Sequence, residues 1–373
     1  MKQSLEKLNI ALVHEWIVNF AGSEKVLQAL AEMYPQADIF TTVYDREKVP
    51  EFANRNVVTS FLQNIPFVKS RRELLIPFAP FAFEQFDLSK YDLVISSTTM
   101  AAKGIITKPS TLHISYCHTP PRYLYEPNLD PRAQKGAFSW LRNKTMHDLR
   151  LWDKVASDRP DVYIANSRYV SNRITKYYKK DSTVIYPPVS VDRYFPAKVE
   201  DKKDYYLFVS RLVDYKRCDI VIEAFNDLGY PLKVIGYGSD EGSLQSKAKD
   251  NIEFLGGKFG EELAKYFREA KALVFAAEED FGIVPVEALA SGIPVIAYGV
   301  GGATESVEDG ETGVFFDEQT SDSIVSAVKK FEKMKIEPQK CVKAAANFSK
   351  EIFKHKMSDF VEKKWQEYNH KDI

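Results

Sequence analysis

The chain has 373 residues, too many for one ordinary hydrophobic core and about the right number for two domains. Hydrophobic residues make up 45 %, which excludes a disordered chain, and 51 basic side chains balance 52 acidic ones, which argues against general binding to nucleic acid. Cys117, Cys218 and Cys341 form no CxxC pair, so we expect neither disulfides nor a zinc site and a cytoplasmic location. We expect no signal peptide, because the apolar run at 10–13 is short, and no membrane-spanning segment.

In the first half of the chain, short apolar runs alternate with helical periodicity, which is typical of βαβ units around a parallel sheet. A helix follows the first run, with Ser23 as its predicted N-cap and Tyr34-Pro35 as its predicted end. Strands are predicted at 10–13, 38–43, 92–96, 112–116, 162–165 and 183–186.

The pattern starts again after a proline-rich stretch at 186–196 and a charged run at 198–204, which we interpret as an interdomain connection. The predicted fold is α/β, with two doubly wound Rossmann-like domains facing across a cleft. The N-terminal domain covers 1–190, the C-terminal domain covers 191–350, and a helix at 351–373 is expected to pack back on the N-terminal domain. Strands of the second domain are predicted at 205–209, 232–235, 252–255, 272–276, 294–297 and 313–316.

One stretch of the second half runs from a predicted strand end into a helix and suits a diphosphate. Gly282 permits a tight turn, after which free N–H groups and the positive end of the helix dipole would meet an anion. Glu287 could accept hydrogen bonds from ribose hydroxyls, and Glu279 could hold sugar hydroxyls. The residues of this candidate donor site are Glu279, Phe281, Gly282, Ile283, Val284 and Glu287.

Two cations follow the first predicted strand of the second domain. Arg211 ends that strand and Lys216 precedes the next helix. A guanidinium fork and an ammonium point charge together could neutralise a diphosphate leaving group as its negative charge grows.

These motifs together resemble the large GT4 family of retaining GT-B glycosyltransferases, over residues 10 to about 348. Glu279 and Glu287 match its EX7E motif, and Arg211 and Lys216 match its phosphate-binding cations. A pair of glutamates eight apart is unspecific alone, but the ordered set of motifs is specific. The other matching segments are Gly236-Tyr237-Gly238, a glycine turn rather than a dinucleotide fingerprint; Phe254-Leu255-Gly256, whose backbone lines the base pocket; 291–297; and Gly301-Gly302. The resemblance adds Gly236, Phe254 and Leu255 to the donor-binding candidates.

In the first domain, the resemblance points to the loop before the first helix and to a histidine. The family loop carries two glycines that approach the donor phosphate and the acceptor; here Ala21 replaces the first and Gly22 keeps the second. An ordinary turn into a capped helix is the alternative. His118 follows a strand and matches a family histidine that contacts the transferred sugar, although a lone histidine is more often packed. The acceptor-side candidates are His14, Arg122 and Tyr123; the last two could equally brace their loop.

The segment at 64–83 mixes cations with aromatic residues. Such chemistry suits attachment to an anionic membrane surface, where a lipid-linked acceptor would lie. The segment could instead be a helical hairpin with its apolar side in the core. The sequence leaves both interpretations open.

The resemblance implies metal-independent transfer of a hexose, with retention of configuration, from a nucleotide diphosphate sugar to a saccharide or lipid-linked saccharide in cell-surface polysaccharide synthesis. It assigns His118, Glu279, Arg211 and Lys216 to catalysis and requires neither a metal nor a cofactor besides the donor. The segment from His118 to Tyr123 is most like the mannosyltransferase-type subgroup, so GDP-mannose is the expected donor. We expect a cytoplasmic protein, peripheral on the inner face of the plasma membrane.

Two other activities remain open. A sugar-nucleotide 2-epimerase of GT-B fold would use similar phosphate contacts but would need acid and base carboxylates facing C2 and no acceptor. A non-enzymatic nucleotide-sugar-binding protein would bind the donor and turn nothing over.

Overall fold

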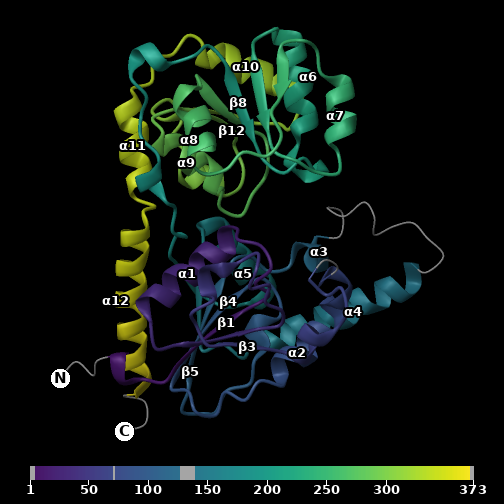
Figure 1. The fold of residues 1–373 in the computed structure, drawn as a ribbon, viewed down its shortest axis with the longest axis vertical. Helices are drawn as coiled ribbons and strands as arrows, with labels where there is room; N and C mark the ends of the chain where they lie inside the picture. The colour runs from purple at the N-terminus through teal and green to yellow at the C-terminus, as the bar shows by residue number, and fades with distance from the viewer. Residues whose placement is uncertain (1–4, 70–71, 127–138, 370–373) are drawn as a thin grey trace. The chain divides into compact units, whose positions relative to one another are not determined.

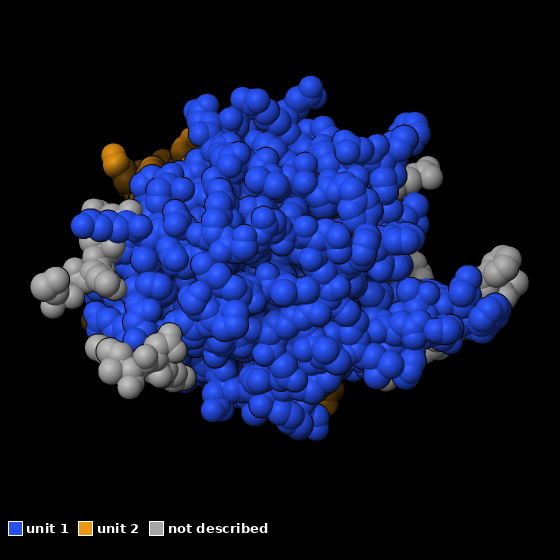
Figure 2. Space-filling model, turned by 90° about the horizontal axis from the view of Figure 1, so that it is seen from below, with its two compact units in different colours: residues 1–188, 353–373 blue, residues 189–352 orange. Residues whose placement is uncertain are grey.

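The computed structural model describes residues 5–69, 72–126 and 139–369. The chain divides into two compact units, unit 1 with residues 1–188 and 353–373 and unit 2 with residues 189–352 (Figures 1 and 2). Both are Rossmann-like α/β units on parallel sheets, which confirms the predicted fold class. In the described parts of the chain, no helix is long and apolar enough to cross a membrane.

Within the described residues, the sheet of unit 1 has seven parallel strands in the order β3-β2-β1-β4-β5-β6-β7. Leu12 in β1, an interior strand, pairs with Ile39 of β2 on one side and Ile95 of β4 on the other. All six strands predicted in this half are present, and β3 at the sheet edge was missed because it is short and only half-buried. The strands are β1 (Ile10–His14), β2 (Asp38–Thr41), β3 (Val57–Thr59), β4 (Leu93–Thr98), β5 (Leu112–Cys117), β6 (Val162–Ala165) and β7 (Ser182–Val184).

Helices cover both faces of this sheet. Ile10 and Leu12 point into a core shared with α1 and α12, whereas Ala11 and Val13 point into a second core shared with α2 and α4. Alternate residues of a strand face opposite sides, so a strand covered on both faces is apolar throughout. The helices of the unit are α1 (Gly22–Met33), α2 (Ala79–Glu84), α3 (Arg122–Tyr125), α4 (Ser139–Ala156), α5 (Arg168–Tyr178) and α12 (Lys350–Asn369).

The start of α1 differs from the sequence prediction. Ala21, not Ser23, is the N-cap, and Ser23 lies in the first turn. The carboxylate of Glu24 accepts the backbone N–H of Ala21 at 3.0 Å and the hydroxyl of Ser23 at 2.9 Å through the same oxygen, Oε2. Glu24, in the first turn, therefore satisfies the backbone N–H of the N-cap residue, as the glutamate of a capping box does.

The C-terminal helix α12 packs on unit 1, beside α1 (Figure 1). Phe353, Met357, Val361 and Trp365 are buried in the core that contains Ile10 and Leu12. Their spacing of four residues keeps them on one side of the helix. The partner surface that the apolar stripe requires is thus the α1 side of the first sheet.

The sheet of unit 2 has six parallel strands in its described part, in the order β10-β9-β8-β11-β12-β13. All six predicted strands are confirmed within one residue at each end. Helix α10 packs on α6, and α11 packs on α9. The elements are β8 (Tyr206–Val209), α6 (Cys218–Leu228), β9 (Leu232–Ile235), α7 (Glu241–Lys247), β10 (Ile252–Phe254), α8 (Gly260–Glu269), β11 (Ala272–Phe275), α9 (Ile283–Ala290), β12 (Val295–Tyr298), β13 (Gly313–Phe316), α10 (Ser321–Phe331) and α11 (Pro338–Ala346).

A substitution in α12 should destabilise unit 1, although the helix lies far along the chain. Met357 is 0 % exposed, so Met357→Ala should lower the free energy of unfolding by about 2–5 kcal/mol through lost burial and a cavity. Urea unfolding followed by tryptophan fluorescence measures this in unit 1 alone, because all four tryptophans lie in that unit, at Trp16, Trp140, Trp152 and Trp365. Gln366→Ala, on the exposed side of the same helix, is the control, and equal losses in both variants would contradict the packing.

Candidate functional site

In unit 2, a glycine turn after β9 holds the loop that carries Arg211. Leu212 donates its N–H to the carbonyl of Tyr237 at 3.0 Å. A Cβ atom at Gly236 would lie 1.8 Å from the carbonyl oxygen of Ser210, and one at Gly238 would lie 2.0 Å from that of Leu212. Only glycine permits so close an approach of two backbones. These glycines shape the loop, as the sequence indicated.

One cation of this loop, Lys216, meets the glutamate-bearing turn. Lys216 Nζ forms an ion pair with Glu279 Oε1, and both side chains are largely buried, 12 % and 24 % exposed. Arg211 donates a hydrogen bond from Nη2 to the hydroxyl of Tyr215, and Lys216 Nζ lies 5.0 Å from the centre of the Tyr215 ring. The structure thus brings Lys216 and Glu279 together, and Tyr215, which the sequence analysis did not single out, braces both cations.

The turn between Glu279 and α9 has the geometry of an anion site. Gly282 is the N-cap of α9 with φ 85° and has no side chain that could cap the helix. The N–H groups of Ile283 and Val284 lie at the electropositive start of this helix. Gly302 donates its N–H to the carbonyl of Glu279 at 2.7 Å, and a Cβ atom at Gly302 would lie 2.2 Å from Phe281 Cα. Close backbone contact thus supports the turn.

The remaining donor-site candidates differ in how much of each side chain is exposed. Glu287 is 7 % exposed and receives a hydrogen bond from Tyr194; burial and this carboxylate together raise the pKa of Tyr194. The ring of Phe281 is buried against Phe348, so only its backbone is available. Phe254 and Leu255 are half-buried at the end of β10. Tyr194 was missed because it lies in the proline-rich connection, where nothing local links it to Glu287.

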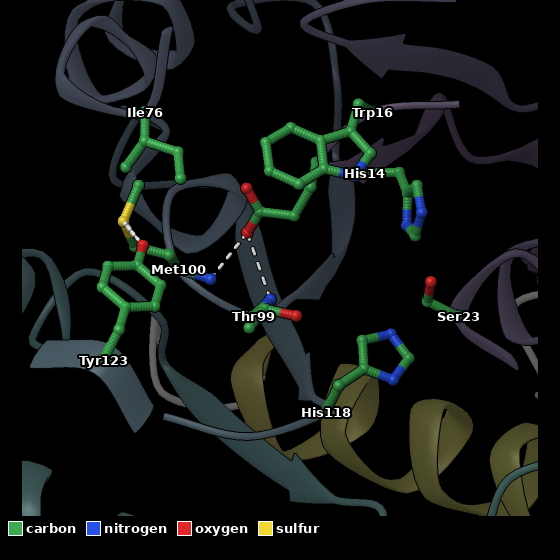
Figure 3. Close-up of a pocket in the computed structure, with 9 residues that line it drawn as sticks. His14, Trp16, Ser23, Ile76, Thr99, Met100, His118 and Tyr123 are labelled. Atoms are coloured by element: carbon green, nitrogen blue, oxygen red, sulfur yellow. Dashed lines mark hydrogen bonds between the residues drawn. The ribbon is translucent and has the colours of Figure 1, made fainter. Parts of the chain in front are cut away.

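In unit 1, the carboxyl ends of β1, β4 and β5 surround a pocket of about 220 Å³ (Figure 3). His14, at the end of β1, and His118, after β5, border it, together with Tyr123 from α3. Tyr123 donates its hydroxyl hydrogen to Met100 Sδ at 2.8 Å. Parallel α/β sheets keep their ligand sites at this edge, so the pocket is the candidate site of unit 1.

Ser97 of β4 links the two histidines of this pocket. Its Oγ lies 3.1 Å from His14 Nδ1 and 2.8 Å from His118 Nε2. His14 is buried, and its Nε2 lies 3.7 Å from Glu24 Oε1. Burial, and then the neighbouring His14, lower the pKa of His118 to about 3, so this imidazole is neutral near pH 7. The sequence analysis missed Ser97, because a serine inside an apolar strand carries no local signal.

Glu15 lines the pocket and holds the turn that follows β4. Its Oε1 accepts the hydroxyl hydrogen of Thr98 at 3.0 Å and the backbone N–H groups of Thr99, Met100 and Ala102 at 3.1, 2.7 and 3.2 Å. Hydrogen bonds to a buried carboxylate are strong, so the turn after β4 is fixed. A glutamate directly after a buried strand is the signal that could have identified it.

Two predicted residues of unit 1 lie outside the described lining of the pocket. Gly22 is the first residue of α1. Arg122 is half-buried, with its guanidinium 5.9 Å from the ring of Tyr169. The structure therefore gathers His14, His118 and Tyr123 but not Gly22 or Arg122.

The segment at 64–83 has both predicted characters. Ala82 and Phe83 of α2 are buried, as in a hairpin packed on the core. Phe67, Phe78 and Phe81 are 81 %, 55 % and 56 % exposed. Of its expected cations, Lys69 pairs with Asp45, Arg71 lies outside the described residues, and the side chain of Arg72 is not described.

Two family models match the chain. Residues 20–193 match Glycosyltransferase Family 4, and residues 191–348 match Glycosyl transferases group 1. The chain belongs to the GT4 family of GT-B glycosyltransferases. The resemblance inferred from the EX7E motif and its companions is thereby confirmed.

Relatives and solved structures of this GT4 protein agree with that assignment. An uncharacterized glycosyltransferase of Methanocaldococcus jannaschii is 34 % identical over 44 % of this chain and 48 % of its own. A GDP-mannose-dependent alpha-(1-6)-phosphatidylinositol monomannoside mannosyltransferase of Mycobacterium tuberculosis is 32 % identical over 46 % and 52 %. The chain spans about half the length of these curated relatives. Sucrose-phosphate synthase from Thermosynechococcus elongatus has a TM-score of 0.72 at 19 % identity, covering 96 % of this chain and 100 % of that one, and shows the shared fold.

The close backbone approach at Gly236 can be tested on stability. Gly236→Ala places a Cβ atom against the Ser210 carbonyl at a φ of 145°, and should cost about 1–3 kcal/mol of strain. Gly242→Ala in α7 is the matched control, since its Cβ atom would meet nothing within 4 Å and should stabilise the helix by up to about 1 kcal/mol. Thermal unfolding followed by circular dichroism compares them. Equal melting temperatures would contradict the described turn.

Proposed function

We propose that this GT4 protein transfers a hexose from a nucleotide diphosphate sugar to a saccharide acceptor, without a metal ion and with retention of configuration. The proposal rests on the ion pair between Lys216 and Glu279. Glu279 lies in the sequence shortly before the start of α9. This arrangement supplies positive charge where a diphosphate would leave and a carboxylate for the sugar attached to it.

The proposed mechanism assigns a task to each candidate side chain. Diphosphate oxygens take the place of Glu279 on Lys216, and Arg211 adds its guanidinium fork. The N–H groups of Ile283 and Val284 stabilise the charge that grows on the leaving group as the anomeric carbon gains oxocarbenium character. Glu279, released from the ion pair, holds sugar hydroxyls.

The acceptor hydroxyl attacks from the face that the diphosphate leaves, which retains the configuration. In unit 2, Glu287 holds the ribose together with Tyr194. In unit 1, His118 orients the transferred sugar, and His14, Arg122 and Tyr123 serve the acceptor. The pocket lined by His14, His118 and Tyr123 supports the roles of these three residues, whereas the role of Arg122 rests on the family resemblance alone.

We further propose GDP-mannose as donor and a lipid-linked saccharide as acceptor, in cell-surface polysaccharide synthesis. The name of the mycobacterial relative, a GDP-mannose-dependent enzyme acting on a phosphatidylinositol mannoside, supports both choices. Small changes in a pocket alter donor preference, so the choice of base and sugar is the part that needs direct measurement.

Incubation with a panel of nucleotide sugars, with and without lipid-linked saccharide acceptors, tests the reaction. We expect acceptor-dependent release of nucleoside diphosphate, fastest with GDP-mannose, an α-linked product and full activity in excess EDTA. Release of free sugar without acceptor dependence, or activity restored only by Mn²⁺, would contradict the proposal. Conversion of the donor to its C2 epimer would establish the epimerase, and donor binding with no turnover would establish the binding protein.

The same assay measures how much Lys216, the cation of the ion pair, contributes to the reaction. Lys216→Met should lower kcat/KM by about 100-fold or more, because a cation facing the developing charge is lost. Lys258 forms a similar pair with Glu262 elsewhere in unit 2, at 2.7 Å, so Lys258→Met is the control and should keep its activity.

We also propose that the protein works as a cytoplasmic enzyme attached to the inner face of the plasma membrane. The support is that one segment of the chain exposes three aromatic side chains, Phe67, Phe78 and Phe81, which would insert at the boundary between headgroups and acyl chains. A lipid-linked acceptor lies at that boundary, so attachment would bring the enzyme to its substrate.

The double variant Phe67→Ser/Phe78→Ser should weaken binding to vesicles of phosphatidylglycerol and phosphatidylethanolamine by about tenfold or more, through lost apolar contact. Co-sedimentation measures the bound fraction. Phe259→Ser, at a ring that is 70 % exposed in unit 2, is the matched control and should not change it. Equal binding of all three proteins would remove the aromatic group from membrane attachment.

A further inference from the structure

Four polar side chains form a chain beneath the pocket of unit 1. Glu24 of α1 faces His14, His14 contacts Ser97 of β4, and Ser97 contacts His118 after β5, over successive separations of 3.7, 3.1 and 2.8 Å. Glu24, His14 and Ser97 are 4 %, 2 % and 1 % exposed. In a buried series of polar groups, each hydrogen bond fixes which atom donates and which accepts in the next one.

The charge states at the two ends of the chain are defined. Burial acts to raise the pKa of Glu24, but the facing His14 and the hydrogen bonds to its carboxylate outweigh burial, and the pKa lies below its usual value. His118 is neutral, as described above. A carboxylate therefore stands at one end and a neutral imidazole with one N–H group at the other.

The hydrogen atoms can then be placed in order. The Nε2 of His14 faces the anionic carboxylate, so this nitrogen carries hydrogen. In a neutral imidazole the other nitrogen, Nδ1, has no hydrogen and accepts the hydroxyl hydrogen of Ser97. A serine hydroxyl has one hydrogen, so the Ser97 oxygen accepts in its contact with His118. The Nε2 of His118 must donate in that contact. In each of the three contacts of this series, the hydrogen is therefore donated in the direction of Glu24.

We propose that His14 is a neutral imidazole and that Ser97 is a positioning residue that transmits this order from Glu24 and His14 to His118 and fixes His118 as the Nε2–H tautomer. The Nδ1 of His118, which has no hydrogen-bond partner among the described residues, is then an acceptor for a sugar hydroxyl. The role in transfer rests on the proposed function; the tautomer does not. His118 also meets the ring of Tyr116 edge-on, with 5.3 Å between centres, which limits rotation of the imidazole.

The neighbouring residue in β4 supplies a matched control. Ser96 Oγ contacts His113 Nε2 at 2.9 Å, with both residues buried, so the same two kinds of side chain meet nearby. Successive residues of a strand point to opposite faces, and His113 is not a described lining residue of the pocket. Ser96→Ala should change His113 and leave His118 and the reaction unchanged.

Glu24→Gln should reverse the direction of these hydrogen bonds while preserving the cap of α1. Oε2 of Glu24 accepts from Ala21 and Ser23, so the amide oxygen of glutamine takes that place and its NH₂ group faces His14 Nε2. His14 then accepts at Nε2 and donates from Nδ1 to Ser97, whose hydroxyl donates to His118 Nε2. His118 becomes the Nδ1–H tautomer.

Long-range ¹H–¹⁵N spectra of the full chain labelled at its six histidines test the tautomer directly. We expect a single Nε2–H pattern for His118 in the unmodified protein, the opposite pattern in Glu24→Gln, and mixed tautomers in Ser97→Ala. His118→Gln assigns the signal, and circular dichroism confirms that each variant is folded. An Nδ1–H pattern in the unmodified protein, or a pattern that neither variant changes, would overturn the proposal.

Kinetics provide the second readout. Ser97→Ala should lower kcat by about tenfold with little change in the donor KM, since one oriented hydrogen bond is lost while His118 remains. If the unmodified protein transfers sugar and Ser97→Ala transfers it equally fast, the positioning role is wrong. If the unmodified protein turns over no donor, the proposed function fails, and the spectra alone still decide the tautomer. If Glu24→Gln unfolds, Ser97→Ala carries both tests.

Discussion

The ion pair between Lys216 and Glu279 depends on backbone contacts that only glycine allows. Gly236 and Gly238 bring one strand end against the loop before Lys216, and Gly302 supports the turn that follows Glu279. Strain in either contact would move one partner of the pair, and a displacement of about 1 Å would impair the electrostatic stabilisation proposed above. The glycines therefore set the geometry of the ion pair.

The two units present different chemistry. Unit 2 offers cations and a helix start, which suit a diphosphate. Unit 1 offers neutral or internally paired groups, since His118 is kept neutral and the carboxylate of Glu15 is occupied by hydrogen bonds. Hydrogen-bonding groups held in this way suit the sugar or acceptor proposed above, because they discriminate by the direction of hydrogen bonds.

Local sequence patterns predicted much of the fold and part of the candidate site. The parallel strands followed from short apolar runs, and the glutamate turn and its cations followed from motif spacing, because each depends on residues close in sequence. Contacts between distant segments could not be predicted. Ser97 meets two histidines from other strands, and Tyr194 reaches Glu287 from the connection between units. Ser23 was assigned as the cap on residue type, whereas Glu24 next to it makes the decisive bond. Edge strand β3 was too short to give an alternating pattern.

The return of α12 to unit 1 makes unit 2 an insertion within unit 1. During synthesis, residues 189–352 leave the ribosome before residues 353–373, so unit 2 can complete its core while the α1 side of the first sheet is still bare. Until α12 arrives, a strip of apolar surface around Ile10 and Leu12 stays open to solvent and to chaperones. Completion of the core of unit 1 thus waits for a segment that is translated after the whole of unit 2.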